Sequence, residues 1–78
     1  MTYHTEEHFT IKKDGIFVDI LLLSLTLFFT YYRVKVNVVD DNKDKSRLLQ
    51  YSDLTYRDKN KAAESYNFNV EYCKDHYL

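Results

Sequence analysis

The chain has 78 residues, a single Cys and a formal net charge of −1, from 11 basic and 12 acidic residues. A chain this short forms at most one domain and buries little surface, and one Cys excludes an intramolecular disulfide. The charges of both signs are interspersed and form no basic stripe of the kind that binds nucleic acid. We therefore expect no nucleic-acid partner.

Residues 1–15 form a first, polar segment of mixed charge. His4 and His8 have the spacing of zinc ligands on a helix, but Thr5 stands where the metalloprotease pattern requires Glu. We expect no metal, no cofactor and no catalytic residue here. Asp14, near the end of the segment, is a good N-cap for a helix that follows.

Residues 16–32 are the most apolar part of the chain and contain one charge, that of Asp19. No Gly, Pro or Asn interrupts the sequence from Ile16 until Asn37, so we predict a continuous helix over about 15–36. Such a helix is about 33 Å long, enough to cross the hydrocarbon of a bilayer. Residues 16–36 are therefore predicted to be a transmembrane helix. Its far end carries the aromatic and basic residues expected at a membrane interface, namely Tyr31, Tyr32, Arg33 and Lys35.

One stripe of this predicted helix is polar and the opposite side is bulky. At 100° per residue the stripe holds Asp19, Leu23, Thr26, Thr30 and Arg33. Polar side chains within a span usually face protein, so we predict that the stripe contacts a partner helix. For Asp19 the alternative is a position near the headgroups, at the helix N-terminus. The bulky side, which we expect to face lipid, holds Phe17, Leu21, Leu25 and Phe28.

A second interpretation of the same residues is a sheet. Phe9 and Ile11 alternate with polar residues before Lys13-Asp14-Gly15, a plausible hairpin turn, and residues 32–38 and 66–72 also alternate. These pieces would assemble into a small soluble α+β domain. Against this, residues 16–39 would form an extended run of some two dozen residues without a turn signal, whereas typical strands have about five or six.

The remaining residues, 37–78, form a third segment that is hydrophilic and rich in Tyr. Residues 44–51 and 57–66 are each compatible with a short helix, and residues 66–72 with an extended stretch. We expect too little apolar area for an independent core, and a tail that becomes ordered by lying across larger subunits. Its predicted contact residues are aromatic, as is common where proteins meet: Tyr51, Tyr56, Tyr66, Phe68 and Tyr72.

Together these features predict a mostly α protein that is not an enzyme. In general build, and in no motif, it resembles the single-span accessory subunits of mitochondrial respiratory complexes and ATP synthases. That resemblance implies a structural subunit in the mitochondrial inner membrane, with larger membrane-embedded subunits and the lipid bilayer as partners and no small-molecule substrate. The alternative function is that of a small soluble α+β interaction module, of a kind a virus could encode, which acts by binding a partner protein.

Overall fold

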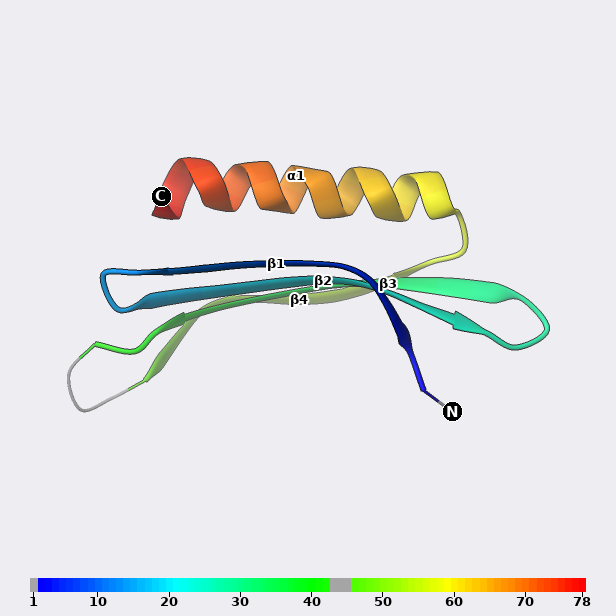
Figure 1. Cartoon of the computed structure of the whole chain (residues 1–78), viewed down its shortest axis with the longest axis horizontal. Helices are drawn as coiled ribbons and strands as arrows, with labels where there is room; N and C mark the ends of the chain where they lie inside the picture. The colour runs from blue at the N-terminus through cyan, green and yellow to red at the C-terminus, as the bar shows by residue number, and fades with distance from the viewer. Residues whose placement is uncertain (1, 43–45) are drawn as a thin grey trace.

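Four strands pair in chain order into one antiparallel sheet, and a C-terminal helix crosses one side of it (Figure 1). The computed structural model describes residues 2–42 and 46–78. Each strand is joined to the next by a hairpin, so neighbours in the sequence are neighbours in the sheet. The elements are β1 (His4–Lys13), β2 (Ile16–Thr26), β3 (Thr30–Asp40), β4 (Arg47–Tyr56) and α1 (Lys59–Tyr77).

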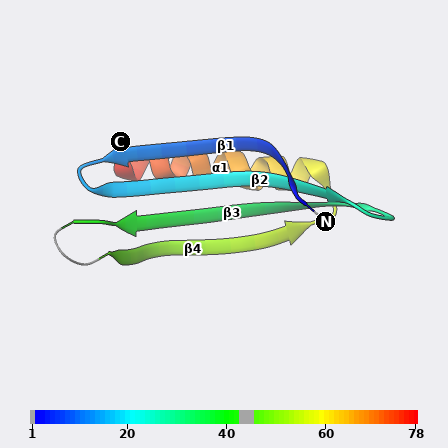
Figure 2. The same ribbon diagram turned by 60° about the horizontal axis from the view of Figure 1, so that its bottom comes forward.

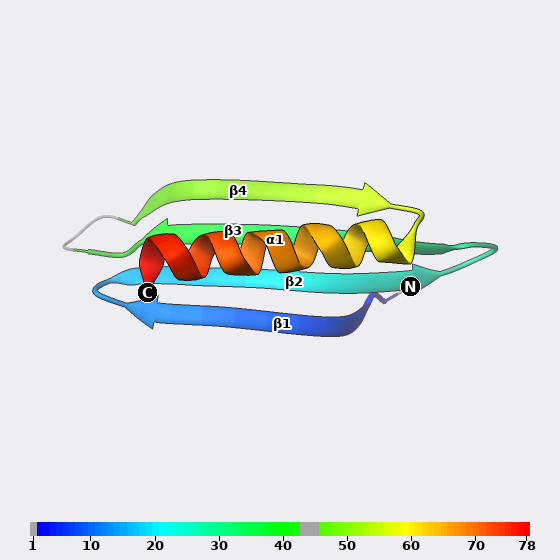
Figure 3. The same ribbon diagram turned by 90° about the horizontal axis from the view of Figure 1, so that it is seen from above.

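The core lies between the sheet and α1. Successive side chains of a strand point to opposite sides, and the even-numbered residues of β2 and β3 face the helix. Ile20 lies opposite Val36 in the β2–β3 pairing, and both side chains are fully buried. Figure 3 shows α1 running over β2 and β3, with β1 and β4 at the two edges. The helix buries Ala62, Tyr66, Val70 and Cys73 against the sheet.

Helix α1 begins at a well-formed cap. Asp58 has an extended backbone, and its carboxylate accepts a hydrogen bond of 2.8 Å from the backbone N–H of Asn60. The buried residues recur at steps of four and three, which places them on one stripe of the helix. The remaining faces of α1 are polar or exposed, so the helix covers one side of the sheet and turns its other sides outward.

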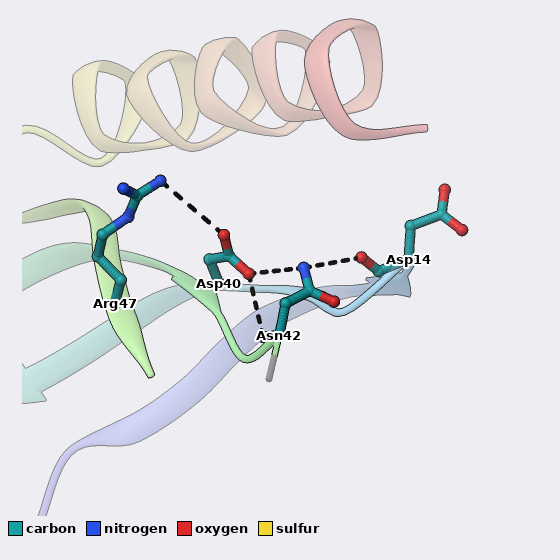
Figure 4. Close-up of polar contacts among 4 residues, drawn as sticks. All are labelled: Asp14, Asp40, Asn42 and Arg47. Atoms are coloured by element: carbon teal, nitrogen blue, oxygen red, sulfur yellow. Dashed lines mark hydrogen bonds and ion pairs between the residues drawn. The ribbon is translucent and has the colours of Figure 1, made fainter. Parts of the chain in front are cut away.

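The β1–β2 turn consists of Asp14 and Gly15, both with positive φ. This is the backbone geometry of the two-residue hairpin turn that matches strand twist. Asn42, which follows β3, reaches across to this turn and donates hydrogen bonds to the Asp14 carbonyl and to Asp40 Oδ1 (Figure 4). The Asp41 N–H also donates to the Gly15 carbonyl, at 2.8 Å. This end of the sheet is thus fastened by polar contacts between two hairpins.

The predicted transmembrane helix is wrong. Residues 16–36 form β2, a turn at 27–29 and most of β3, and the two strands pair with each other along their length. Among the residues that the structure describes, no helix combines the length and the apolar character needed to cross a bilayer. The mostly α fold class, the membrane keywords and the mitochondrial inner-membrane location all depended on that span and are corrected with it.

The partner-ordered tail is corrected as well. Residues 47–56 form an edge strand and residues 59–77 form α1, and both pack on the same chain. Residues 57–66 were expected to be helical, and most of them are. The extended stretch predicted at 66–72 is wrong, because those residues lie within α1. The helix predicted over 44–51 is contradicted over residues 47–51, which belong to β4, while residues 44 and 45 lie outside the described residues. The alternation at 66–72 combines two residues of the buried stripe, Tyr66 and Val70, with two exposed aromatic residues, Phe68 and Tyr72.

Candidate partner-binding surface

The side of the sheet that faces away from α1, here called the open face, has no described element over it (Figure 2). It carries the odd-numbered residues of β2 and β3 and, after the register shift at Leu49, those of β4. On β2 these are largely apolar, so β2 presents hydrophobic side chains to both sides of the sheet. The central open-face residues of β2 are half-buried by longer neighbours and include Leu21, Leu23 and Leu25.

The β2–β3 turn forms an exposed apolar apex, defined as Leu27, Phe28 and Phe29. It projects past the start of α1 (Figures 1 and 3). The exposed fraction is 49% for Leu27, 99% for Phe28 and 56% for Phe29. Isolated apolar side chains are common on protein surfaces, but consecutive large ones with a fully exposed ring are not. The apex is therefore a candidate contact surface.

Local contacts hold the apex in one shape. The hydroxyls of Thr26 and Thr30 are hydrogen-bonded at 3.0 Å, and the Leu27 N–H donates to the Phe29 carbonyl at 2.9 Å. These bonds close the turn without Gly, Pro or Asn. Because the loop is already ordered, binding of a partner would cost little conformational entropy in this loop.

Arg57, the residue directly after β4, contacts the apex. Its guanidinium lies 4.3 Å from the ring centroid of Phe29 and 5.4 Å from that of Tyr31. A cation over an aromatic face is attracted to the ring quadrupole. Phe29 is thereby fixed toward the open face, while Phe28 remains free of cover.

The centre of the open face carries an ion pair. Arg33 donates to Asp53 through both Nε and a terminal nitrogen, with 3.0 Å for the Nε bond. The hydrogen bond from Arg33 lowers the pKa of the Asp53 carboxyl, and the same hydrogen bond to Asp53 raises the pKa of the Arg33 guanidinium. The ring of Tyr3 lies 4.9 Å from the Arg33 guanidinium, so the N-terminal residues cross the open face toward β3. Both charges are satisfied within the chain.

The residues predicted to form a partner-helix interface are brought together by strand pairing. Leu23 lies opposite Arg33, and Thr26 lies opposite Thr30 at the apex. Asp19 is further along the open face and forms an ion pair with His8. The helical stripe that grouped the five residues does not exist, and their contact with a partner stays a prediction. Phe28, at the tip of the turn, was one of the four residues assigned to lipid, because no turn signal marks residues 27–29.

The predicted tail contacts are dispersed over the molecule. Tyr51 is exposed on the open face, and Tyr56 donates a 3.0 Å hydrogen bond to Ser65 of α1. Tyr66 belongs to the core, where burial raises the pKa of its phenol. Phe68 and Tyr72 are exposed on the outside of α1, stacked with centroids 6.4 Å apart. Their role in binding a partner is untested.

Polar sites elsewhere in the described residues are small. Within residues 2–42 and 46–78, no group of three or more His, Cys, Asp or Glu is arranged to hold a metal ion. A hollow beside the Asp14–Gly15 turn is lined by both hairpin ends, including Lys12, Phe17 and Val39. Of its polar groups, the Asp14 carbonyl accepts a hydrogen bond from Asn42, and the Ser46 hydroxyl donates to the Asp41 carboxylate.

The fold and surface define the class: a small two-layer α+β domain, a four-stranded antiparallel meander with one helix on one side and an open, partly apolar face on the other. This agrees with the alternative drawn from the sequence, that of a small α+β module, and not with the membrane subunit. Comparisons with models of known protein families, with curated proteins and with solved structures give no match to the chain.

Proposed function

We propose that this chain is a non-catalytic module that acts by binding a partner protein, with the apex inserted into an apolar pocket of that partner. The observation that carries the proposal is Phe28, whose side chain is 99% exposed at the tip of an ordered hairpin. The apex has no titratable side chain. Recognition there is therefore a matter of shape and of burying apolar surface.

The apex is large enough to act as the anchor of a protein–protein interface. Complete burial of a Phe side chain contributes about 1.5–3 kcal/mol, and interface hot spots are typically aromatic or Arg residues seated in pockets. Phe29, held by Arg57, and Leu25 beside the turn continue the apolar surface onto the open face. The ion pairs of Arg33 and His8 lie further along this face and would form part of the polar rim.

The experiment uses a photo-crosslinking amino acid at position 28 of the full chain in its host cells, followed by mass spectrometry to identify the captured protein. The affinity of that purified partner is then measured for the wild type and for Phe28→Ser. Loss of the buried ring is expected to weaken binding roughly 30-fold, which corresponds to about 2 kcal/mol. The far-UV circular dichroism spectrum should not change, since Phe28 contributes nothing to the core.

Phe68→Ser is the matched control, because Phe68 is 69% exposed on the outer side of α1. Its affinity should stay within about twofold of the wild type, as expected for a residue outside an interface. Equal affinities for wild type and Phe28→Ser, or a greater loss for Phe68→Ser, would show that the apex is not the binding element. The latter result would instead support the contacts predicted for the C-terminal residues.

A further inference from the structure

The two edges of the sheet differ in how well they are protected against another strand. An edge strand exposes unpaired backbone N–H and C=O groups, and proteins blunt such edges with charges and bulges. β1 has both: its register with β2 shifts between Thr5 and Glu7, and it carries charged side chains of both signs, namely Glu6, Glu7, Lys12 and Lys13. The residues that precede it also turn across the open face, where Tyr3 meets Arg33.

β4 lacks this protection over most of its length. Its register shift lies near the start, where Leu49 is the extra residue between the Val38–Gln50 and Val39–Leu48 pairs. From Gln50 to Tyr56 the pairing is regular, and the only charged residue is Asp53. Tyr51 is 57% exposed and Leu54 is 55% exposed, on opposite sides of the strand.

The backbone groups that point outward can be assigned from the register. In antiparallel ladders, hydrogen-bonded and non-bonded pairs alternate. The bond from Asp41 to Gly15 continues the β2–β3 register, which makes its odd-numbered pairs the hydrogen-bonded ones. The even-numbered residues of β3 therefore bond to β4, at pairs such as Val34–Leu54 and Val36–Ser52. The N–H and C=O groups of Tyr51, Asp53 and Thr55 are left to face outward.

We propose that β4 pairs with β4 of a second copy of this chain, antiparallel about a two-fold axis at Leu54, to form a continuous sheet across two molecules. In this register Asp53 lies opposite Thr55 of the second copy and exchanges both hydrogen bonds with it. The exposed Leu54 side chains meet at the axis on the helix side. On the open face, Tyr51 lies opposite Arg57, whose guanidinium also contacts Phe29 and Tyr31 of its own chain, so the Tyr51 ring joins an existing cation–π cluster.

Two neighbouring registers, with the axis at Asp53 or at Ser52, are less favourable. An axis at Asp53 sets two like charges directly opposite each other, which destabilises a strand pair. An axis at Ser52 places Leu54 opposite Gln50 and runs the pairing through the register shift at Leu49. In the register centred at Leu54, apolar side chains meet each other, an aromatic ring meets a cation, and no two like charges lie opposite each other. This self-complementarity is the reason to assign the edge to a second copy of this chain.

The first measurement is the mass of the full chain across a concentration series, by light scattering and sedimentation equilibrium. We expect the mass to rise toward that of a dimer. Thr55→Pro removes an outward N–H without removing a bond to β3 and should leave a monomer with unchanged circular dichroism. Thr10→Pro is the matched control, since Thr10 has the same outward orientation on β1, and it should still dimerise. A monomer at every concentration, or equal loss of dimer in both variants, would overturn the proposal.

A second measurement tests the position of the axis. Leu54→Cys should form disulfide-linked dimers under mild oxidation, because facing residues in a non-bonded pair are about 4.5 Å apart between Cα atoms. Ser52→Cys places the two thiols about 13 Å apart along the strand and should crosslink roughly tenfold more slowly. Cys73 is buried, and burial raises the pKa of its thiol, so it will not compete. Crosslinking of Ser52→Cys at the same or a higher rate would overturn the Leu54-centred pairing.

Discussion

Gly15 occupies a backbone conformation that few other residues tolerate, with φ of +78° in the β1–β2 turn. A Cβ atom at this position would overlap the side-chain amide of Asn42. That amide donates to the Asp14 carbonyl and to Asp40, so it cannot move without releasing the contact between the two hairpins. Two separate constraints, conformation and space, therefore favour Gly at this one residue.

Gly15→Ala should lower the free energy of unfolding by about 1–3 kcal/mol, the typical cost of a strained backbone residue. Urea unfolding followed by circular dichroism measures it. Asp14→Asn is the control: Asn also tolerates positive φ, and the Asp14 contact with Asn42 uses its backbone carbonyl. The control should lie within about 0.5 kcal/mol of the wild type. A harmless Gly15→Ala would mean that the turn and Asn42 can rearrange together.

At the scale of the element, α1 depends on how it begins. The Asp58 carboxylate accepts a hydrogen bond from the Asn60 N–H, and Asp58 lies in the short connection between β4 and α1. The carboxylate also interacts favourably with the positive end of the helix dipole. The first turn of α1 contains no other acidic residue, so the cap relies on this one side chain.

Asp58→Ala is expected to reduce the free energy of unfolding by about 1 kcal/mol, within the usual range for loss of an N-cap. The reduction would appear as a lower urea midpoint with an unchanged slope. Asp75→Ala is the comparison, since Asp75 is exposed in the last turn, where a negative charge opposes the dipole. That variant should be neutral or slightly stabilised. A larger loss for Asp75→Ala would contradict the assigned role of the cap.

Considered as a whole, the molecule has a core to which both halves of the chain contribute. Val18, Ile20 and Leu22 of β2 pack with residues of β3 and with the buried stripe of α1. Removal of α1 would expose that side of the sheet to water. Unfolding of the helix and unfolding of the sheet should therefore be one event.

We expect the isolated chain to unfold in a single cooperative transition. Circular dichroism near 222 nm, which is sensitive to α1, and Tyr fluorescence, which reports on residues throughout the sheet and helix, should give the same midpoint in urea. Hydrogen exchange should protect amides in β2 and α1 to a similar degree. Loss of α1 at lower urea than the sheet would indicate that the C-terminal half needs a partner for its order.

Several local features could be predicted from the sequence. Lys13-Asp14-Gly15 indicates a hairpin turn, and the alternation of Tyr32, Val34, Val36 and Val38 indicates a strand with one buried side; both agree with the structure. The candidate surface was harder to predict. Leu27, Phe28 and Phe29 form a turn closed by Thr26 and Thr30, and none of these residue types signals a turn.

The sequence by itself determined where apolar residues concentrate, where the first hairpin turns, and that 78 residues form at most one small domain without an intramolecular disulfide. It did not determine whether residues 16–36 are a helix or two strands. β2 is apolar on both sides, so its pattern has no period of two and matches a buried helix equally well. Only the tertiary structure decided the matter. β3 satisfies the backbone hydrogen bonds of β2, α1 covers one side of β2, and the other side remains open. The physical reason is that the core is built by residues from both halves of the chain, so no single segment contains the information that selects strand over helix.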